Sequence, residues 1–282
     1  MAKKYTISSF LKYINIKEIG NDNIQVIHYD EHQDILLKSD PVKLDFYLIA
    51  IKTNIVVSPP IEEMSSTYLF LDKPGNLMEW DLGDTFMGYG IFISEKLIKE
   101  ISNKYTFTGY NRHEALYLTE RESKILMDLF QKSYDEFCQP DFSEEILVSY
   151  TSLILSYTQN FYERQFQSRS KIYNQIVLNF YKQLDNYYNQ VNDEPSLPTV
   201  AYFADQSNLS VNYFGDLIKH FTGRSPLEHI HEYIIHIAKE KLRQTNLTVN
   251  EIAFELGFGY PTYFTRFFRL KTGVSPKNYR KQ

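Results

Sequence analysis

The sequence predicts an α+β protein whose β-rich amino-terminal half is followed by a helical hairpin and an all-helical carboxyl-terminal domain. Three observations lead to this prediction. Between positions 23 and 93, short β-branched and aromatic runs alternate with turn residues. After Thr119 the apolar period becomes that of helices. The last third of the chain contains one structural unit twice.

The composition indicates a folded protein of two domains. Its 282 residues give room for two cores, and aromatic residues make up 16% of the chain. The single cysteine, Cys138, cannot form a disulfide within the chain, so nothing indicates an oxidising compartment. No apolar run reaches the length of a signal peptide or the ~18 residues of a membrane span. We therefore expect a cytoplasmic protein that does not enter membranes.

The repeated unit lies between Pro198 and Pro276. Ala204 matches Ala253 at an offset of 49 residues. Further matches follow at an offset of 50: Tyr213-Phe214 with Tyr263-Phe264, Thr222-Gly223 with Thr272-Gly273, and Ser225-Pro226 with Ser275-Pro276. Each copy combines a short helix, a tight turn and a longer amphipathic helix, which is a helix-turn-helix.

Local signals mark where these helices begin and end. Thr248 and Glu251 form a capping box, and Ser225 with Glu228 forms another that is followed by proline at the first helical position. Gly223 and Gly273 stand where a helix ends in the left-handed conformation. A long helix from Pro226 to about Thr245 should connect the two units.

Charge is divided unevenly along the chain. From Ser196 onward there are 11 Lys and Arg against 7 Asp and Glu, whereas the remainder has 19 against 28. After Glu255 no acidic residue occurs, and six basic residues follow: Arg266, Arg269, Lys271, Lys277, Arg280 and Lys281. This asymmetry suggests that the carboxyl-terminal domain meets a polyanion.

A connecting helix of about 18 residues is roughly 27 Å long. With the width of its flanking units, it would space the two long helices by ~34 Å, one turn of DNA, so that one chain reads an asymmetric site.

The amino-terminal half predicts several antiparallel strands, typical of a small barrel or a sandwich. An interior lined by Phe46, Tyr47, Trp80, Tyr89 and Phe92 would either hold a small molecule or be filled by these rings alone. The stronger runs are Ile24–Ile27, Phe46–Ile51, Ile55–Val57, Thr67–Leu71 and Tyr89–Ile93.

Helices are expected at 120–138, at 143–163 and from Lys171 to Tyr188. The first two form a hairpin that either packs on the sheet or provides a homodimer interface. A polar segment ended by Pro195 then leads into the repeat. We place the domains at 1–165, for regulation, effector binding or dimerisation, and at 166–282, for DNA binding.

One short motif would point to an enzyme. His28, Glu31 and His32 fit H-x-x-E-H, which in zinc peptidases needs both histidines on one helical face. Here the first histidine ends a β-like run and a turn follows, so the two imidazoles should not converge. The spacing of His229, His231 and His236 also misses the four-residue step of a helical metal site. We expect no metal, no cofactor and no catalytic residue.

An ordered series of motifs in the carboxyl-terminal ~115 residues resembles the AraC/XylS family of bacterial transcription regulators. The residues that carry the resemblance are Ala238–Leu242, Glu251–Phe258, Tyr263–Arg269 and Thr272–Arg280. The resemblance implies a cupin-like amino-terminal barrel, sequence-specific binding to double-stranded DNA, recruitment of RNA polymerase, most often as an activator, and control by a small-molecule effector. The alternative is a cupin-like or zinc-dependent enzyme with an accessory DNA-binding domain.

The family's base-reading positions fall on the start of each long repeat helix. In the second unit they are Pro261, Thr262, Thr265 and Arg266; an arginine can contact guanine through two hydrogen bonds, and Arg269 and Lys271 suit phosphates. In the first helix-turn-helix unit Asn212 can pair with adenine, whereas Gly215 has no side chain to reach a base. Asp216 would repel a phosphate, although its carboxylate can accept a hydrogen bond from cytosine. Lys219 and His220 can still contact the backbone. The first unit is therefore expected mainly to set register.

Overall fold

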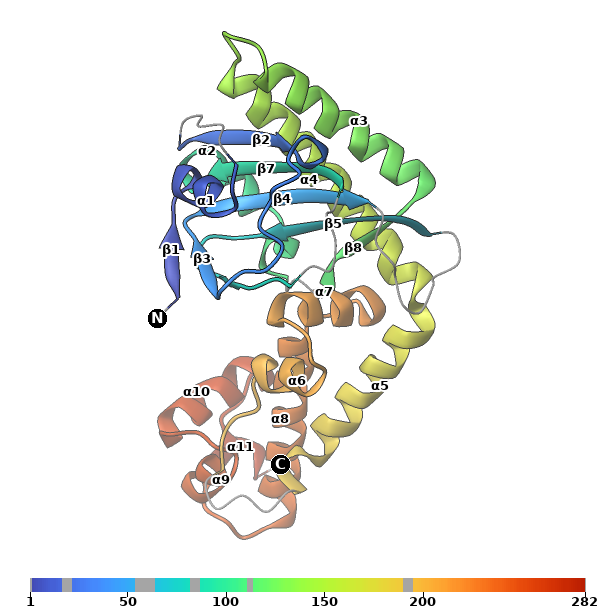
Figure 1. Cartoon of the computed structure of the whole chain (residues 1–282). Coiled ribbons are helices and arrows are strands. Elements are labelled where there is room, and N and C mark those ends of the chain that lie inside the picture. The colour runs from blue at the N-terminus through green and yellow to red at the C-terminus, as the bar shows by residue number, and fades with distance from the viewer. Residues whose placement is uncertain are drawn as a thin grey trace. The chain divides into compact units, whose positions relative to one another are not determined.

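The computed structural model describes residues 2–16, 22–53, 64–81, 87–110, 114–189 and 195–281. They form two compact units, Met1–Ser168 and Arg169–Gln282, which Figure 1 shows in blue to yellow-green and in yellow to red. Within the described residues, no helix combines the length and the apolar character that crossing a membrane requires.

The first unit is built on an antiparallel sheet in the order β2-β7-β4-β5-β8. Its strands are β2 (Ile24–His28), β4 (Phe46–Thr53), β5 (Met64–Asp72), β7 (Met87–Ser94) and β8 (Leu116–Thr119). Four of the five expected runs lie in these strands; Ile55–Val57 lies outside the described residues. The central strands β4 and β7 are buried along nearly their whole length, because both faces of the sheet are covered.

A second, smaller sheet has the order β1-β3-β6, with β1 (Lys3–Tyr5) parallel to β3 (Val42–Leu44) and β6 (Leu77–Met78) antiparallel to it. The fold is therefore mixed helix and sheet, as expected. A cupin-like barrel is not confirmed, since among the described strands the two sheets share no member and do not close on one another.

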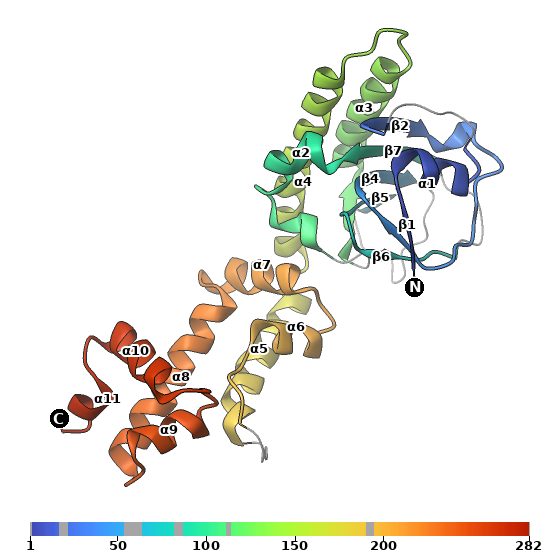
Figure 2. The ribbon, with the colours of Figure 1, turned by 90° about the vertical axis from the view of Figure 1, so that its left-hand side faces the viewer.

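Helices lie on both faces of the large sheet (Figure 2). On one face are α2 (Glu95–Ser102), α3 (Glu120–Phe137) and α4 (Glu144–Ser168). On the other are α1 (Ile7–Tyr13) and the small sheet. The short 3-10 helices η1 (Tyr29–Glu31) and η2 (Thr106–Gly109) complete the unit. The hairpin of α3 and α4 thus packs on the sheet.

The second compact unit, Arg169–Gln282, has helices as its only regular elements in the described residues 169–189 and 195–281. Its long helices are α5 (Ser170–Asn186), α7 (Val211–Thr222), α8 (Pro226–Gln244) and α10 (Pro261–Thr272); its short ones are η4 (Tyr187–Asn189), α6 (Val200–Gln206), α9 (Val249–Glu255) and α11 (Pro276–Tyr279). The pairs α6–α7 and α9–α10 are the two helix-turn-helix units, and α8 connects them.

The expected helix ends of this unit are confirmed. Both capping boxes form, and the hydrogen bonds that Glu251 accepts from Thr248 hold the pKa of this glutamate below its usual value. Gly223 and Gly273 end α7 and α10 with φ of 76° and 80°, the left-handed region that favours glycine. Local sequence therefore determines where the two long repeat helices stop.

One ion pair holds α4 against the sheet and α3. The Nη2 atom of Arg164 donates to Glu122 Oε2 at 2.6 Å and to the Tyr117 carbonyl at 2.7 Å. The Glu122 carboxylate also accepts from the Thr119 amide, which caps α3. Because the Glu122 side chain is only 10% exposed, its charge depends on Arg164 for neutralisation.

We predict that Arg164→Ala lowers the free energy of unfolding of the first unit by about 2–3 kcal/mol, because it leaves a mostly buried carboxylate without its counter-charge. The matched control is Lys132→Ala, since Lys132 pairs with Asp128 on the exposed surface of α3 and its loss should change little. Chemical denaturation of the full chain measures both. Equal losses for the two variants would contradict this role of Arg164.

Candidate nucleic-acid interface

The helix α10 is fixed by one apolar face. Phe264 and Phe268 are fully buried, and their rings lie 5.8 Å apart. The Phe258 ring, from the turn before α10, lies 5.4 Å from Phe264, and the Tyr279 ring of α11 lies 5.5 Å from Phe268. Neighbours on both sides therefore hold α10 in one orientation and leave most of its opposite face exposed.

That opposite face carries the residues expected to meet DNA. Thr262, Arg266 and Arg269 are exposed, and Pro261 and Thr265 are half-buried. These five line one concave surface, to which Asn250 of α9, Leu270 and Gly273 also contribute. Lys271 is exposed but lies outside this surface.

Three residues of this surface were missed by the sequence reasoning: Asn250, Leu270 and Gly273, the last of which was predicted only to end the helix. Leu270 is 80% exposed and follows Arg266 by one helical turn, so helical spacing alone would have placed it on this face. Asn250 comes from the preceding helix, and only the packing of α9 against α10 brings it here. An exposed leucine beside two arginines suits contact with a thymine methyl group.

The basic residues near α10 divide into two groups. Across residues 195–281, no carboxylate forms an ion pair with Arg266, Arg269 or Lys271. Arg280, in contrast, donates from Nη2 to the Leu247 carbonyl at 2.6 Å and from Nε to the Leu242 carbonyl at 3.1 Å. Arg280 therefore ties the chain end to α8, although the sequence had counted it among the basic residues facing a polyanion.

The first helix-turn-helix unit has the same architecture as the second but a different outer face. Tyr213, Phe214, Leu217 and Ile218 of α7 are buried, and the Tyr213 hydroxyl lies 2.5 Å from that of Tyr173 on α5. The outer residues Asn212, Lys219 and His220 are exposed, Asp216 is half-buried, and a Cβ atom at Gly215 would meet nothing within 4 Å. The matching face thus has fewer side chains for bases and carries an acidic group.

Both helix-turn-helix units are attached to the segment that precedes α6. Gly257, in the turn of the second unit, has φ of 86°, and a Cβ atom there would lie 2.3 Å from the Ser196 backbone. The Tyr188 hydroxyl donates to the Leu256 carbonyl at 3.0 Å, and its ring stacks on Tyr233 of α8. The turn of the second helix-turn-helix unit is therefore packed directly against the segment of chain that leads into the first helix-turn-helix unit.

Two of the three histidines of α8, His229 and His231, have packing roles. The His231 ring lies 5.1 Å from that of Phe267, and burial, with the charge of Lys271, lowers the pKa of His231. Burial also lowers the pKa of His229, whose ring contacts Thr222 and Phe180. Both imidazoles are therefore neutral at pH 7 and add no positive charge to the interface.

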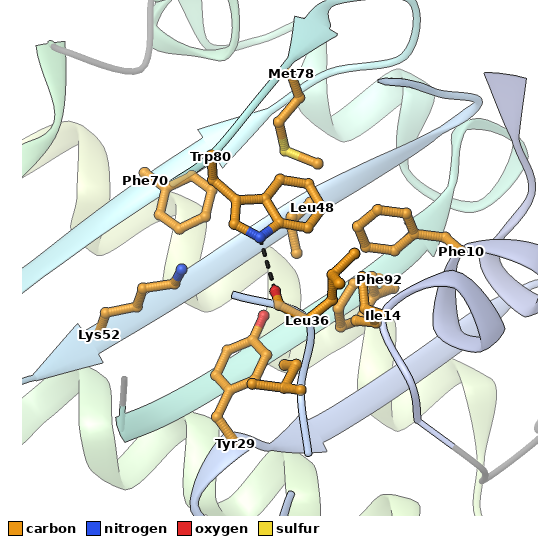
Figure 3. Close-up of a pocket in the computed structure, with 11 residues that line it drawn as sticks. Phe10, Ile14, Tyr29, Leu36, Leu48, Lys52, Phe70, Met78, Trp80 and Phe92 are labelled. Atoms are coloured by element: carbon orange, nitrogen blue, oxygen red, sulfur yellow. Dashed lines mark hydrogen bonds between the residues drawn. The ribbon is translucent and has the colours of Figure 1, made fainter. Parts of the chain in front are cut away.

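The five aromatic residues expected inside a barrel lie on two faces of the sheet. Trp80 and Phe92 line a cavity (Figure 3), and Phe46 belongs to the same core cluster. Tyr47 instead accepts a hydrogen bond from Ser102 of α2, and Tyr89 donates to Gln131 of α3. Neighbouring residues of a strand point to opposite faces, so the prediction that all five share one interior is corrected.

The first histidine of the H-x-x-E-H motif pairs with neighbouring carboxylates. His28 lies 3.0 Å from Asp30 through Nε2 and 3.1 Å from Glu31 through Nδ1. The Tyr134 hydroxyl donates to Glu31 at 2.6 Å, and this bond lowers the pKa of the glutamate. In the part of the chain that the structure describes, no three His, Cys, Asp or Glu side chains gather as metal ligands do.

Comparison with known proteins places the carboxyl-terminal compact unit in a family. Residues 203–282 match a family described as a helix-turn-helix domain. The regulator AlkR of Acinetobacter baylyi is 29% identical over 36% of this chain and 33% of its own length. An AraC-like transcription regulator of Streptomyces lividans is 32% identical over 29% of this chain and 27% of its own.

The carboxyl-terminal unit is an AraC-type helix-turn-helix domain. The resemblance found in the sequence is thus confirmed for this part of the chain. A third relative of the AraC-type domain, named as the bifunctional transcriptional activator and DNA repair enzyme AdaA of Bacillus subtilis, is 31% identical over 29% of this chain and 39% of its own length. The matched region of this chain therefore spans between about a quarter and two fifths of the length of these three relatives.

Substitutions at two glycines of the AraC-type domain test how its second helix-turn-helix unit is held against the Ser196 segment. We predict that Gly257→Ala lowers the free energy of unfolding by about 3 kcal/mol, because left-handed backbone and a collision with Ser196 add together. Gly273→Ala has the same backbone conformation and nothing within 4 Å, so it should cost about 1 kcal/mol. Thermal and chemical denaturation measure both; equal costs would mean that the Ser196 contact is unimportant.

Proposed function

We propose that this chain is a sequence-specific, DNA-binding transcription regulator, acting as an activator. The observation that carries the proposal is the outer face of α10, where Arg266 and Arg269 pair with no carboxylate of residues 195–281 and lie on an AraC-type domain. Arginine suits both guanine edges and phosphates, and a helix of this size fits the major groove.

The two long repeat helices would bind unequally. The α10 face supplies Thr262, Thr265 and Arg266 for bases, with Arg269 and Lys271 on phosphates. The α7 face supplies Asn212, with Lys219 and His220 on the backbone, and carries Asp216 where the second unit has Arg266. In this proposal the second helix-turn-helix unit provides most sequence discrimination, and the first helix-turn-helix unit sets the register in the neighbouring groove.

The remaining proposals concern the amino-terminal compact unit. We propose that Met1–Ser168 is a cupin-like regulatory domain that responds to a small molecule, and that the assembled regulator recruits RNA polymerase. A homodimer through the α3–α4 hairpin is supported by α4, where Ile146 and Leu153 are both 44% exposed and line one hollow with Tyr150. Apolar side chains one and two helical turns apart suit a helix–helix contact between two copies.

An enzyme with an accessory DNA-binding domain is the second candidate. The naming of AdaA as both activator and repair enzyme keeps this candidate open, but the His28 cluster gives it no independent support. Selection of bound fragments from genomic DNA tests the regulator proposal itself, because a sequence-specific regulator recovers a small set of sites at moderate salt. Recovery of random fragments alone would contradict the proposal.

On a selected fragment, we predict that Arg266→Ala relaxes the preference at one or two base pairs, at a cost of about 1–3 kcal/mol on the preferred sequence. Lys271→Ala should instead weaken all sequences alike and reduce the salt slope by about one. Affinities for the site and its single-base variants, at several salt concentrations, measure both. Parallel losses on every sequence for both variants would show that Arg266 reads no base.

A further inference from the structure

Two tyrosines at the start of α10 are exposed. Tyr260, the residue before the helix, is 64% exposed, and Tyr263, in the first turn, is 63% exposed. Their rings lie 5.5 Å apart, with the edge of one toward the face of the other. In the sequence they flank Pro261 and Thr262, which line the concave surface of α10. The aromatic pair is therefore continuous with the surface proposed to meet DNA.

The internal repeat shows that a tyrosine at the position of Tyr263 can be packed inside the domain. Its match in the first helix-turn-helix unit is Tyr213, which is buried and whose hydroxyl lies 2.5 Å from that of Tyr173 on α5. In the second unit the same residue type lies at the surface, three residues before Arg266 and on the same side of the helix. Its exposure is thus a property of the second unit alone.

Tyr260 occupies the position of a helix cap. Its match in the first unit is Ser210, whose side chain accepts a hydrogen bond from the Tyr213 amide at 3.1 Å and caps α7. The Tyr260 side chain makes no such bond to α10. Serine, threonine, aspartate and asparagine are preferred at this position because their side-chain oxygen accepts that bond. Departures from a local rule of this kind are expected where a residue serves binding.

The size of the major groove brings this pair to the DNA backbone. A helix with its side chains is about 10–12 Å across and the groove is about 12 Å wide, so a helix lying in it has a phosphate strand along each flank. When Thr262 and Arg266 face the bases, Tyr263 is turned from Thr262 by about 100° around the helix axis and lies on one flank. Tyr260 packs against Tyr263 and extends that flank.

We propose that Tyr260 and Tyr263 contact one DNA strand at the wall of this groove, with their hydroxyls donating to phosphate oxygens and their rings against the deoxyribose. Tyrosine is among the side chains that bind phosphates in protein–DNA complexes. Nucleic acid is the occupant because the pair adjoins the surface of Arg266 and Arg269, and no acidic residue follows Glu255 in the sequence. The inference rests on the proposed function, to which it adds contacts that give affinity without sequence information.

A neutral contact with the backbone is recognised by its effect on affinity. Tyr260→Phe and Tyr263→Phe each remove only a hydroxyl, and each should weaken binding about two- to tenfold, on the selected fragment and on its single-base variants alike. The dependence of affinity on salt concentration should keep the wild-type slope, because no charge is lost. Fluorescence anisotropy of a labelled duplex, at several salt concentrations, measures both quantities.

Two further variants separate this role from a structural one. Tyr181→Phe is the matched control, because Tyr181 is an exposed tyrosine of α5 outside the concave surface, and its loss of a hydroxyl should leave DNA binding unchanged. Tyr260→Ser supplies the cap that Ser210 provides in the first unit. It should raise the melting temperature of the protein and at the same time weaken DNA binding.

Wild-type affinity of both phenylalanine variants would overturn the proposal, and so would a loss confined to one base pair, since the rings would then read a base. The same variants are compared on a random duplex, because a backbone contact does not depend on sequence. If the wild type selects no fragment but binds a random duplex that the variants bind more weakly, the regulator proposal fails and this one stands. If a fragment is selected and the variants bind it as the wild type does, this inference alone fails; no binding to any duplex would overturn both.

Discussion

The contact between Gly257 and the Ser196 backbone is the constraint on which the carboxyl-terminal unit depends. It brings the turn of the second helix-turn-helix against the chain that enters the first, and Tyr188 adds a hydrogen bond to Leu256 beside it. Together with α8, which both units pack against, this contact makes the two repeats one body. Two DNA-reading helices carried by one body can recognise only sites with one spacing, which is a source of specificity independent of any base contact.

The duplication kept the core and changed the surface. Phe214 and Phe264 are equally buried at matching positions, and Gly223 and Gly273 end the two long helices in the same conformation. The outer faces differ: α10 presents arginines that pair with no carboxylate of residues 195–281, and α7 presents a glycine and an aspartate. Packing is therefore shared and charge is not, and in the proposed function the two helix-turn-helix units divide the work of binding.

The parts of the structure that depend on local sequence could be predicted from it. The helix starts at Ser225 and Thr248 follow from side chains three residues apart, and the resemblance to AraC-type domains rests on contiguous motifs. The surface of α10 was predicted for the same reason, since helical spacing fixes which of Thr262, Arg266 and Arg269 share a face.

The parts that depend on distant contacts could not be predicted. Barrel closure requires pairing between strands far apart in sequence, and the two sheets do not provide it within the described residues. Tyr47 and Tyr89 were assigned to the wrong face, because alternation shows which residues share a face but not which face is covered by helices. The role of Arg280 and the position of Asn250 both depend on packing between helices.

In the proposed complex, one chain places α7 and α10 in successive major grooves on one side of the duplex. Hydroxyl-radical footprinting of this chain on a selected fragment tests that arrangement. We expect two protected segments of unequal strength, about ten base pairs apart, within one asymmetric site. A single protected segment, or two equal ones related by a palindrome, would contradict it.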